Sequence, residues 1–296
     1  MSNAKEIKER MGSIQETKKI TNAMYLISSS KMKQAKKKLS DTEPFFYGMQ
    51  AEIARILRHV PDMHSQFFDQ REEKKPEDRK IGYIVVTADK GLAGAYNHNV
   101  LRMVEEKIKG PGQHKLFVLG ELGRQYFAKR TDVELDMSFR YTVQNPTLYR
   151  ARHIQQRILE LYLNNELDEV YIIYTRMINA FKMEAEQFKL LPLAKEDYVK
   201  EDQKYYSGEV SFHPSVESVL DNLIPNVVAG FIYGALVESY ASEHNSRMMA
   251  MQTATDSAKE MLHDLEIEYN RVRQAAITQE ITEVIAGAKA QKNKKK

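Results

Sequence analysis

The stretch RVRQAAITQEITEVIAGAKA, residues 271–290, decides how the C-terminal part of the chain folds. It is rich in good helix formers, with one glycine and no proline, which predicts a helix. Its apolar side chains surround most of that helix: Ala275, Ala276, Ile277, Ile281, Val284, Ile285 and Ala286. Since an apolar surface of this width needs cover, the stretch predicts a contact with another polypeptide.

The helical pattern extends upstream from this stretch to about Ser215. Apolar and small residues recur there at alternate spacings of four and three, as in the seam of a coiled coil. The seam comprises Leu220, Leu223, Val227, Gly230, Gly234, Val237, Ala241, His244, Met248, Met251, Thr255, Ala258, Leu262, Leu265, Tyr269, Val272 and Ala276. The pattern fails after Ala276, and Pro225 either kinks the first turns or marks the start of the helix.

A second long helix is predicted from Ala4 to about His59, where the only proline is Pro44. Its seam has the same spacing and comprises Ile7, Met11, Ile14, Lys18, Thr21, Tyr25, Ser28, Met32, Ala35 and Leu39. The middle of this seam is polar, and a neighbouring face carries apolar side chains at Ile20, Ala23, Met24 and Ile27. Such a helix is contacted from more than one side.

The residues between the two helices have the pattern of an α/β domain. IGYIVVT, residues 81–87, is a continuous apolar run typical of a strand covered on both faces. Helices and strands then alternate: a helix around 101–108, a strand at 115–120, helices at 122–129 and within 147–165, and strands at 170–175 and within 184–193. The alternation predicts an open, Rossmann-like α/β layer structure. We expect the divisions 1–75 (helix and linker), 76–210 (α/β domain) and 211–296 (helix).

The lengths of the two helices predict an unpaired end. About 75 residues of helix extend roughly 110 Å, more than a compact domain of this size can cover. The N-terminal helix is the only long partner, and attachment to one α/β domain makes the pair antiparallel. Since that helix has only about 55 residues, the C-terminal helix extends beyond it by about 20 residues, or about 30 Å.

No catalytic or ligand-binding motif is evident. TADKGLAGAYN, residues 87–97, matches neither GxGxxG nor GxxxxGK[ST], so a tight turn allowed by Gly91 and Gly94 is favoured. Asp89 and Lys90 have no recognisable nucleophile or base beside them. With no cysteine and eight scattered histidines, we expect no metal and no cofactor. We also expect no membrane span or signal peptide, which places the chain in the cytosol or on the cytosolic side of a membrane.

The basic residues concentrate near the N-terminus. Residues 1–40 contain ten Lys or Arg against three Glu, and KMKQAKKK, residues 31–38, is the densest part. This segment is either a solvated helix face or a surface for an acidic partner. Nucleic acid is a candidate partner, but only Tyr25 lies nearby and stacking aromatic residues are missing, which argues against it.

Three stretches closely resemble the gamma subunit of F-type ATP synthases: residues 7–35 (from IKERMGSIQ), 85–97 (VVTADKGLAGAYN) and 232–288 (from IYGALVESY). The resemblance covers essentially the whole chain in the same order. That family usually has TSDRGLCGGYN in the middle stretch, from which this chain departs at Ala88, Lys90, Ala93 and Ala95. The departures lie outside the long helices.

The resemblance implies a rotor without an active site. Three alpha and three beta subunits would surround the helix pair, and the catalytic sites would belong to the beta subunits. The α/β domain would meet the epsilon subunit and the membrane c-ring. The chain itself would bind no nucleotide and no nucleic acid, would not insert into the membrane, and would lie at the cytoplasmic face of a bacterial membrane. The coupling ion, proton or sodium, is not set by this chain.

The resemblance also implies contact residues. Arg273, Gln274 and Thr278 match residues that meet a loop of the beta subunit as a rotational catch. The remaining expected contacts are Ile281 and Ile285 in a hydrophobic sleeve, and Lys31 and Lys33 facing acidic loops. The matching seams of the two helices, rather than the resemblance, predict that Met24 lies opposite the region around Arg247, and both count among the expected contact residues. The alternative function is a coiled-coil adaptor whose α/β module binds an acidic partner or nucleic acid, followed by an enzyme with an unrecognised site.

Overall fold

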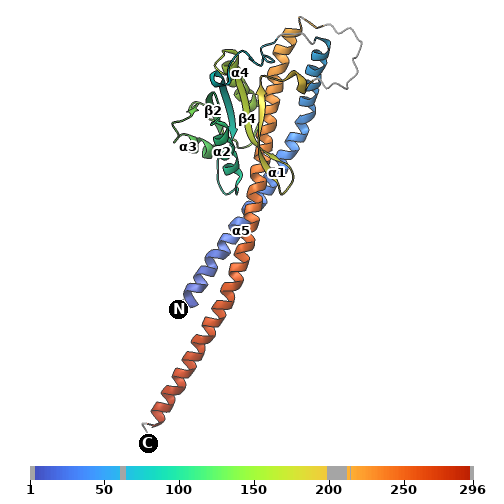
Figure 1. Cartoon of the computed structure of the whole chain (residues 1–296). Helices are drawn as coiled ribbons and strands as arrows, with labels where there is room; N and C mark the ends of the chain where they lie inside the picture. Colours follow the sequence, from blue (N-terminus) through green and yellow to red (C-terminus); the bar gives the residue numbers. More distant parts are fainter. Residues whose placement is uncertain (1–3, 61–64, 199–211, 214, 294–296) are drawn as a thin grey trace. The chain divides into compact units, whose positions relative to one another are not determined.

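The computed structural model describes residues 4–60, 65–198, 212–213 and 215–293. Its residues form two compact units, which we call the terminal unit (Met1–Ile27 and Met248–Lys296) and the central unit (Ser28–Arg247). The long helices α1 (Ala4–His59) and α5 (Val216–Asn293) contribute residues to both units (Figure 1). The expected domain limits stay predictions, and the one at 210/211 lies outside the described residues.

The central unit contains a five-stranded sheet in the order β3-β2-β1-β4-β5. Its strands are β1 (Lys80–Val86), β2 (Gln113–Leu119), β3 (Glu134–Leu135), β4 (Glu169–Met177) and β5 (Met183–Leu191). β1, β2, β3 and β4 pair in parallel, whereas β5 pairs with β4 in the antiparallel direction. The predicted open α/β fold is confirmed. The two-residue strand β3 was not predicted, since so short a segment has no periodicity to read.

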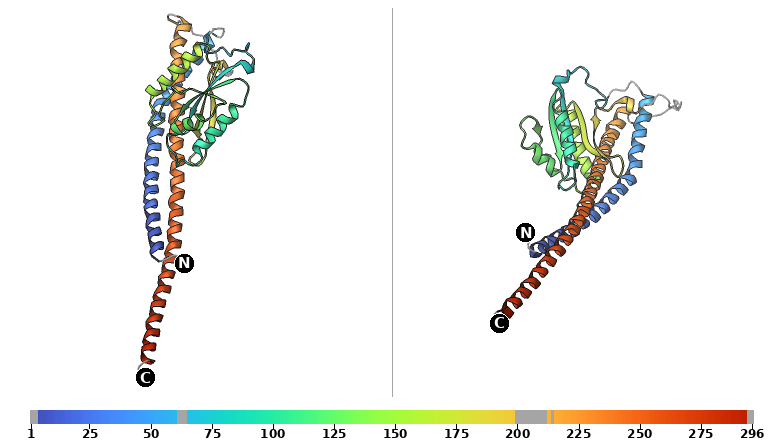
Figure 2. Two further views of the ribbon diagram at one scale, coloured as in Figure 1. Left: turned by 90° about the vertical axis from the view of Figure 1, so that its left-hand side faces the viewer. Right: turned by 60° about the horizontal axis from the view of Figure 1, so that its bottom comes forward.

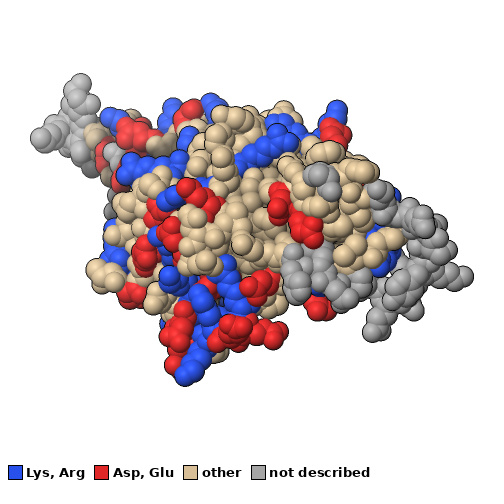
Figure 3. Space-filling view, turned by 90° about the horizontal axis from the view of Figure 1, so that it is seen from above, with Lys and Arg blue, Asp and Glu red and all other residues tan. Residues whose placement is uncertain are grey.

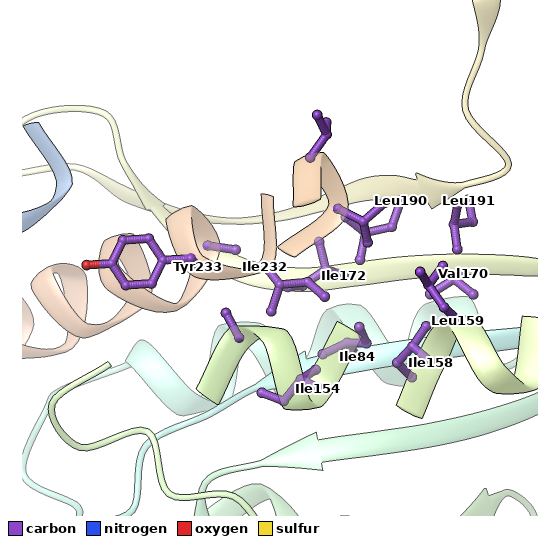
Figure 4. Close-up of a cluster of buried hydrophobic side chains, with 14 of the residues drawn as sticks. Ile84, Ile154, Ile158, Leu159, Val170, Ile172, Leu190, Leu191, Ile232 and Tyr233 are labelled. Atoms are coloured by element: carbon purple, nitrogen blue, oxygen red, sulfur yellow. The ribbon is translucent and has the colours of Figure 1, made fainter. Parts of the chain in front are cut away.

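Helices cover both faces of this sheet. They are α2 (Tyr96–Lys107), α3 (Glu121–Phe127), α4 (Leu148–Leu163) and the central-unit parts of α1 and α5; two 3₁₀ turns span Pro76–Asp78 and Lys195–Asp197. Tyr83 and Val85 of β1 pack with α2 and α3, whereas Ile84 and Val86 join the core with α4 and α5. Figure 4 shows this second core, with Ile84 among side chains of α4, β4, β5 and α5. Burial on both faces explains the continuous apolar run of β1.

In the central unit, α1 and α5 pack against each other. The ring of Phe46 lies against α5 at Gly230 and is 6.2 Å from the ring of Tyr233. Earlier on α1, the positive charge of Lys31 acts to lower the pKa of Glu243, which lies later on α5. Because an earlier part of α1 is thus close to a later part of α5, the two segments run antiparallel. Pro225 lies inside α5, so it does not mark the helix start.

In the terminal unit, residues 4–27 of α1 run beside α5 (Figure 2). The hydroxyl oxygens of Thr21 and Thr255 are 2.7 Å apart in the buried seam. Within the two units, every predicted seam residue is buried or half-buried except Ala276. Hydrophobic and small residues at this spacing therefore do mark the buried faces.

One helix among the described residues, α5 over Val216–Lys289, is long and apolar enough to cross a membrane by length and composition alone. Of its apolar window, 56% is buried inside the chain. A core helix meets the same criterion, and the packing of α5 on the sheet accounts for its apolar composition. The expectation of no membrane span stays a prediction, because length and composition alone do not show that a helix crosses a membrane.

Candidate functional site

The first candidate site is the free end of α5, residues 273–289, which we call the overhang. Every side chain in it is exposed. Its large apolar side chains are Ile277 (46% exposed), Ile281 (54%), Val284 (72%) and Ile285 (52%). The last seam residue in contact is Val272, which is half-buried. The overhang therefore presents apolar surface that no described residue of its unit covers, a feature of protein-interaction sites.

The polar residues expected to form a catch all lie on this overhang or at its start. Arg273 is exposed, and no ion pair joins it to another described residue. Gln274 and Thr278 share a face, since the Thr278 hydroxyl donates a hydrogen bond to the Gln274 carbonyl oxygen at 2.9 Å. Their side chains are thus close enough to meet one partner segment, and their role stays a prediction.

The other expected contact residues lie apart from the overhang. Met24 is half-buried in the terminal unit, and Arg247 is buried in the central unit, so their expected proximity stays a prediction. Lys31 is half-buried and Lys33 is exposed, both in the central unit. Lys31 faces Glu243 and His244 of its own chain.

A second candidate site lies where α5 crosses the carboxyl ends of the central strands. Ser239 accepts a hydrogen bond from the Thr175 amide of β4 at 3.2 Å, and Ser242 donates to the Thr175 carbonyl oxygen at 3.1 Å. Three residues further, Asn245 Nδ2 donates to the Ala180 carbonyl oxygen at 2.7 Å. Three polar side chains of one helix face thus bind the end of β4 and the turn after it.

Arg247 makes the matching contact with the loop after β1. Its guanidinium donates to the carbonyl oxygens of Gly91, at 3.0 Å from Nη2, and Lys90, at 3.1 Å. The same group pairs with Glu243 at 2.7 Å and donates from Nη1 to His244 Nδ1 at 3.3 Å. Ser239, Ser242, Asn245 and Arg247 are called the clamp from here on.

The loop after β1 is shaped to present those two carbonyl groups. Leu92 and Gly94 have positive φ angles of 62° and 55°, whereas Gly91 does not, so the predicted tight turn is confirmed at Gly94 but not at Gly91. Asp89, considered above for a reactive site, accepts hydrogen bonds from the backbone amides of Glu121 and Val143. Its carboxylate therefore holds the loop to the start of α3.

Burial sets the protonation of the groups beside Arg247. Burial raises the pKa of the Glu243 carboxyl above its usual range, although the Arg247 guanidinium opposes the shift. Burial, with the positive charges of Arg247 and Lys31, lowers the pKa of His244 to about 4. His244 is therefore neutral near pH 7, which lets its Nδ1 accept from Arg247.

The clamp occupies the place where this fold class binds ligands. Open α/β sheets bind ligands outside the carboxyl ends of strands where the strand order reverses, here between β1 and β4. The Thr175 amide, the Thr175 carbonyl and the Gly91 carbonyl are instead bonded to α5. Among the described residues, no group of three or more His, Cys, Asp or Glu could hold a metal ion. The crevice at the carboxyl ends of β1 and β4 is thus occupied by α5 of the same chain.

Sequence reasoning named Arg247 only as a contact residue opposite Met24, and it did not predict the clamp. Ser239, Ser242 and Asn245 recur every three residues in a stretch of α5 that follows the apolar run of residues 227–237. That spacing places polar groups along one face of a buried helix, where they need partners. This spacing is the feature of the sequence from which the clamp could have been predicted.

Fold and sites together define an α/β protein with a long helix whose apolar end is exposed. The crevice in which this fold class binds ligands is occupied by the same helix. A family model described as ATP synthase matches residues 3–291. The ATP synthase gamma chain of Ruminiclostridium cellulolyticum is 46% identical over 293 residues, covering 98% of this chain and 99% of the relative. The sodium ion specific ATP synthase gamma chain of Acetobacterium woodii is 37% identical over 303 residues, covering 97% and 98%.

Solved structures share the fold. A chain from the central stalk and c-ring of the Tetrahymena thermophila mitochondrial ATP synthase superposes with a TM-score of 0.57 at 23% identity, covering 79% of this chain and 99% of that one. A chain of the Euglena gracilis mitochondrial ATP synthase gives 0.57 at 17% identity, covering 93% and 97%.

The chain belongs to the ATP synthase gamma chain family. It is a non-catalytic subunit of ATP synthase and serves as the central rotor shaft, which couples ion flow in the membrane sector to conformational cycling of the catalytic beta subunits.

Proposed function

We propose that the overhang, residues 273–289, is the end of the shaft that turns inside a ring of three alpha and three beta subunits. The observation that carries this proposal is that every side chain of this segment is exposed while its surface is rich in Ala and Ile. Apolar contact depends little on orientation, so a hydrophobic sleeve can hold the helix and still let it slide. Ile281 and Ile285 provide this contact.

Arg273, Gln274 and Thr278 form the catch that engages a loop of a beta subunit at one rotational position. Arg273 is exposed and in no ion pair with a described residue, so a partner carboxylate can reach it. A hydrogen bond to a charged group contributes about 1.5 to 3 kcal/mol, which is large enough to matter and small enough to break on each turn. Met24, Lys31 and Lys33 belong to the contacts of the same shaft further from its tip. Arg247, expected among these contacts, is buried in the clamp and is left out of this proposal.

The α/β domain is the part that meets the epsilon subunit and the membrane c-ring, at the cytoplasmic side of the membrane and without insertion. On the face of the molecule in Figure 3, Lys and Arg alternate with Asp and Glu, and no large area of one sign appears. Such a mixed surface favours specific docking over adsorption to an anionic lipid surface, for which clustered basic residues are typical.

The test is a double variant in the intact purified complex. Arg273→Ala with Gln274→Ala should assemble normally but lower ATP synthesis and steady-state hydrolysis, because the rotational contact is weakened. The matched control is Asn270→Ala with Arg271→Ala, which removes one arginine and one side-chain amide just before the catch. Full turnover and coupling in the first double variant, or equal losses in both, would contradict the catch.

A further inference from the structure

The central unit contains a cavity that the clamp and the overhang do not use. It has a volume of about 340 Å³ and lies between α1, α5, β4 and β5. Aromatic side chains from all four elements line it: Phe46, Tyr47, Tyr174, Phe188 and Phe231. The rings of Phe188 and Phe231 are 5.0 Å apart, and Phe46 is 9% exposed. The cavity is within the size range of small-molecule sites, which are mostly apolar and aromatic.

Two glycines on α5 produce this space. A Cβ atom at Gly230 would lie 2.2 Å from Cδ1 of Phe46, so only glycine lets that ring lie on the helix. One turn later, a Cβ atom at Gly234 would meet nothing within 4 Å. The ring is thus held at one end of the cavity, and the space beside Gly234 stays open.

The charges around the cavity are mostly negative. Three carboxylates line it, Glu43, Glu186 and Glu238, against one guanidinium, Arg176. Arg176 pairs with Glu186 at 2.7 Å, whereas Glu43 and Glu238 take part in no ion pair among the described residues. Glu238 is half-buried and accepts only the Met177 amide at 3.3 Å. Burial also raises the pKa of the Glu238 carboxyl, and a bound cation would relieve that shift.

We propose that this cavity is a binding site for a small organic cation, an aryl or alkyl ammonium or amidinium. The faces of the aromatic rings attract a cation, and Glu238 and Glu43 supply the opposite charge. An anion would face two carboxylates outside any ion pair. For Glu238 the charge of Arg176 only partly opposes the effect of burial, so a neutral ligand would leave that effect in place. The site is independent of the rotor contacts, because none of its lining residues belongs to the clamp or the overhang.

The first test compares two probes of the same shape. Benzamidine is a cation at pH 7.5, and benzamide is its neutral counterpart. Titration calorimetry on the purified full chain should show benzamidine binding at least about tenfold more tightly than benzamide, which corresponds to about 1.4 kcal/mol. Equal affinities, or no detectable binding of benzamidine, would overturn the proposal.

The second test locates the binding. Gly234→Leu fills the cavity and should abolish benzamidine binding, whereas Gly234→Ala leaves most of the volume and should retain it. Glu238→Gln should lower the affinity for benzamidine at least fivefold and leave benzamide unchanged, and Glu280→Gln on the overhang is the surface control. The thermal unfolding midpoint of each variant confirms that it is folded. If Gly234→Leu or Glu238→Gln left the affinity intact in a folded protein, the cation would bind elsewhere and the proposal would fail.

Discussion

One helix, α5, behaves differently in its two units. In the central unit, residues 235–245 are buried or half-buried, and their polar side chains bond to β4 and the turn after it. In the terminal unit, residues 273–289 are exposed, and the side-chain hydrogen bonds there join only residues of the same helix. Both segments are equally regular helix, so helix formation does not depend on burial here.

The difference shows where each segment obtains its stability. The central segment is fixed by its own chain, through apolar packing and the hydrogen bonds of Ser239, Ser242 and Asn245 to β4 and the turn after it. The overhang is helical without contacts to other described residues, and its apolar surface is uncovered. Four experiments test this contrast and the packing around it.

The largest effect is expected at two arginines, one in each segment. Arg247→Met removes the partner of buried Glu243 and of two carbonyl groups, so the free energy of unfolding should fall by about 3 to 5 kcal/mol at pH 8. Arg273→Met, on the exposed surface, should change it by less than about 0.5 kcal/mol. Urea unfolding of the full chain, followed by tyrosine fluorescence, measures both.

The raised pKa of Glu243 provides an internal check on that prediction. Since a neutral carboxyl tolerates burial, the loss from Arg247→Met should be smaller at pH 5 than at pH 8. Glu243→Leu added to Arg247→Met should recover part of the stability by removing the unpaired charge. Equal losses from the Arg247 and Arg273 variants would refute the contrast between the segments.

The next largest change in stability is expected at two glycines that lie one turn apart in the central unit. Gly230→Ala forces its Cβ atom into the ring of Phe46 and should cost about 1 to 3 kcal/mol. Gly234→Ala meets no atom within 4 Å and should raise stability by up to about 1 kcal/mol, because alanine is the better helix former. Unfolding midpoints of the two variants should therefore move in opposite directions. If both midpoints moved in the same direction, the ring of Phe46 would not be fixed against Gly230.

A pH effect is expected from His244. Its pKa in the folded chain, about 4, lies below the ordinary 6.5, so between these values the unfolded chain binds more protons. The free energy of unfolding contributed by neutral His244 is thus complete above about pH 6.5 and is lost as the pH falls toward 4. His244→Asn keeps an acceptor for Arg247 without this titration. The stability difference between the two proteins should change over pH 6.5 to 4, and a constant difference would contradict the assignment.

Much of the fold could be predicted because the residues that become buried recur at regular spacings along the sequence. The two seams placed both long helices, since spacings of four and three match one helix face. The run at residues 81–87 identified the strand covered on both faces. The free end followed from the unequal lengths of α1 and α5, a difference visible in the printed sequence.

The clamp and the cavity could not be predicted in this way. Ser239 and Thr175 are 64 positions apart, and only the tertiary fold brings them together. Gly230 and Gly234 look alike in the seam, yet one touches Phe46 and the other borders empty space. Such differences arise from the shape of neighbouring side chains, which periodicity does not report.

The smallest effect on the chain itself is expected at the overhang. Ile281→Ser removes a side chain that is 54% exposed, so the unfolding of the full chain should change by less than about 0.5 kcal/mol. In the assembled ATP synthase the same change removes apolar contact with the surrounding subunits, and the complex should lose the shaft more readily on dilution. Ile267→Ser, at a position 58% exposed but in the paired part of the terminal unit, is the matched control. Retention of the shaft, measured by native mass spectrometry, should fall for Ile281→Ser more than for Ile267→Ser, because the proposed function places only the overhang inside a sleeve of other subunits. Equal retention of both variants would mean that the apolar surface of the overhang does not hold the shaft in place.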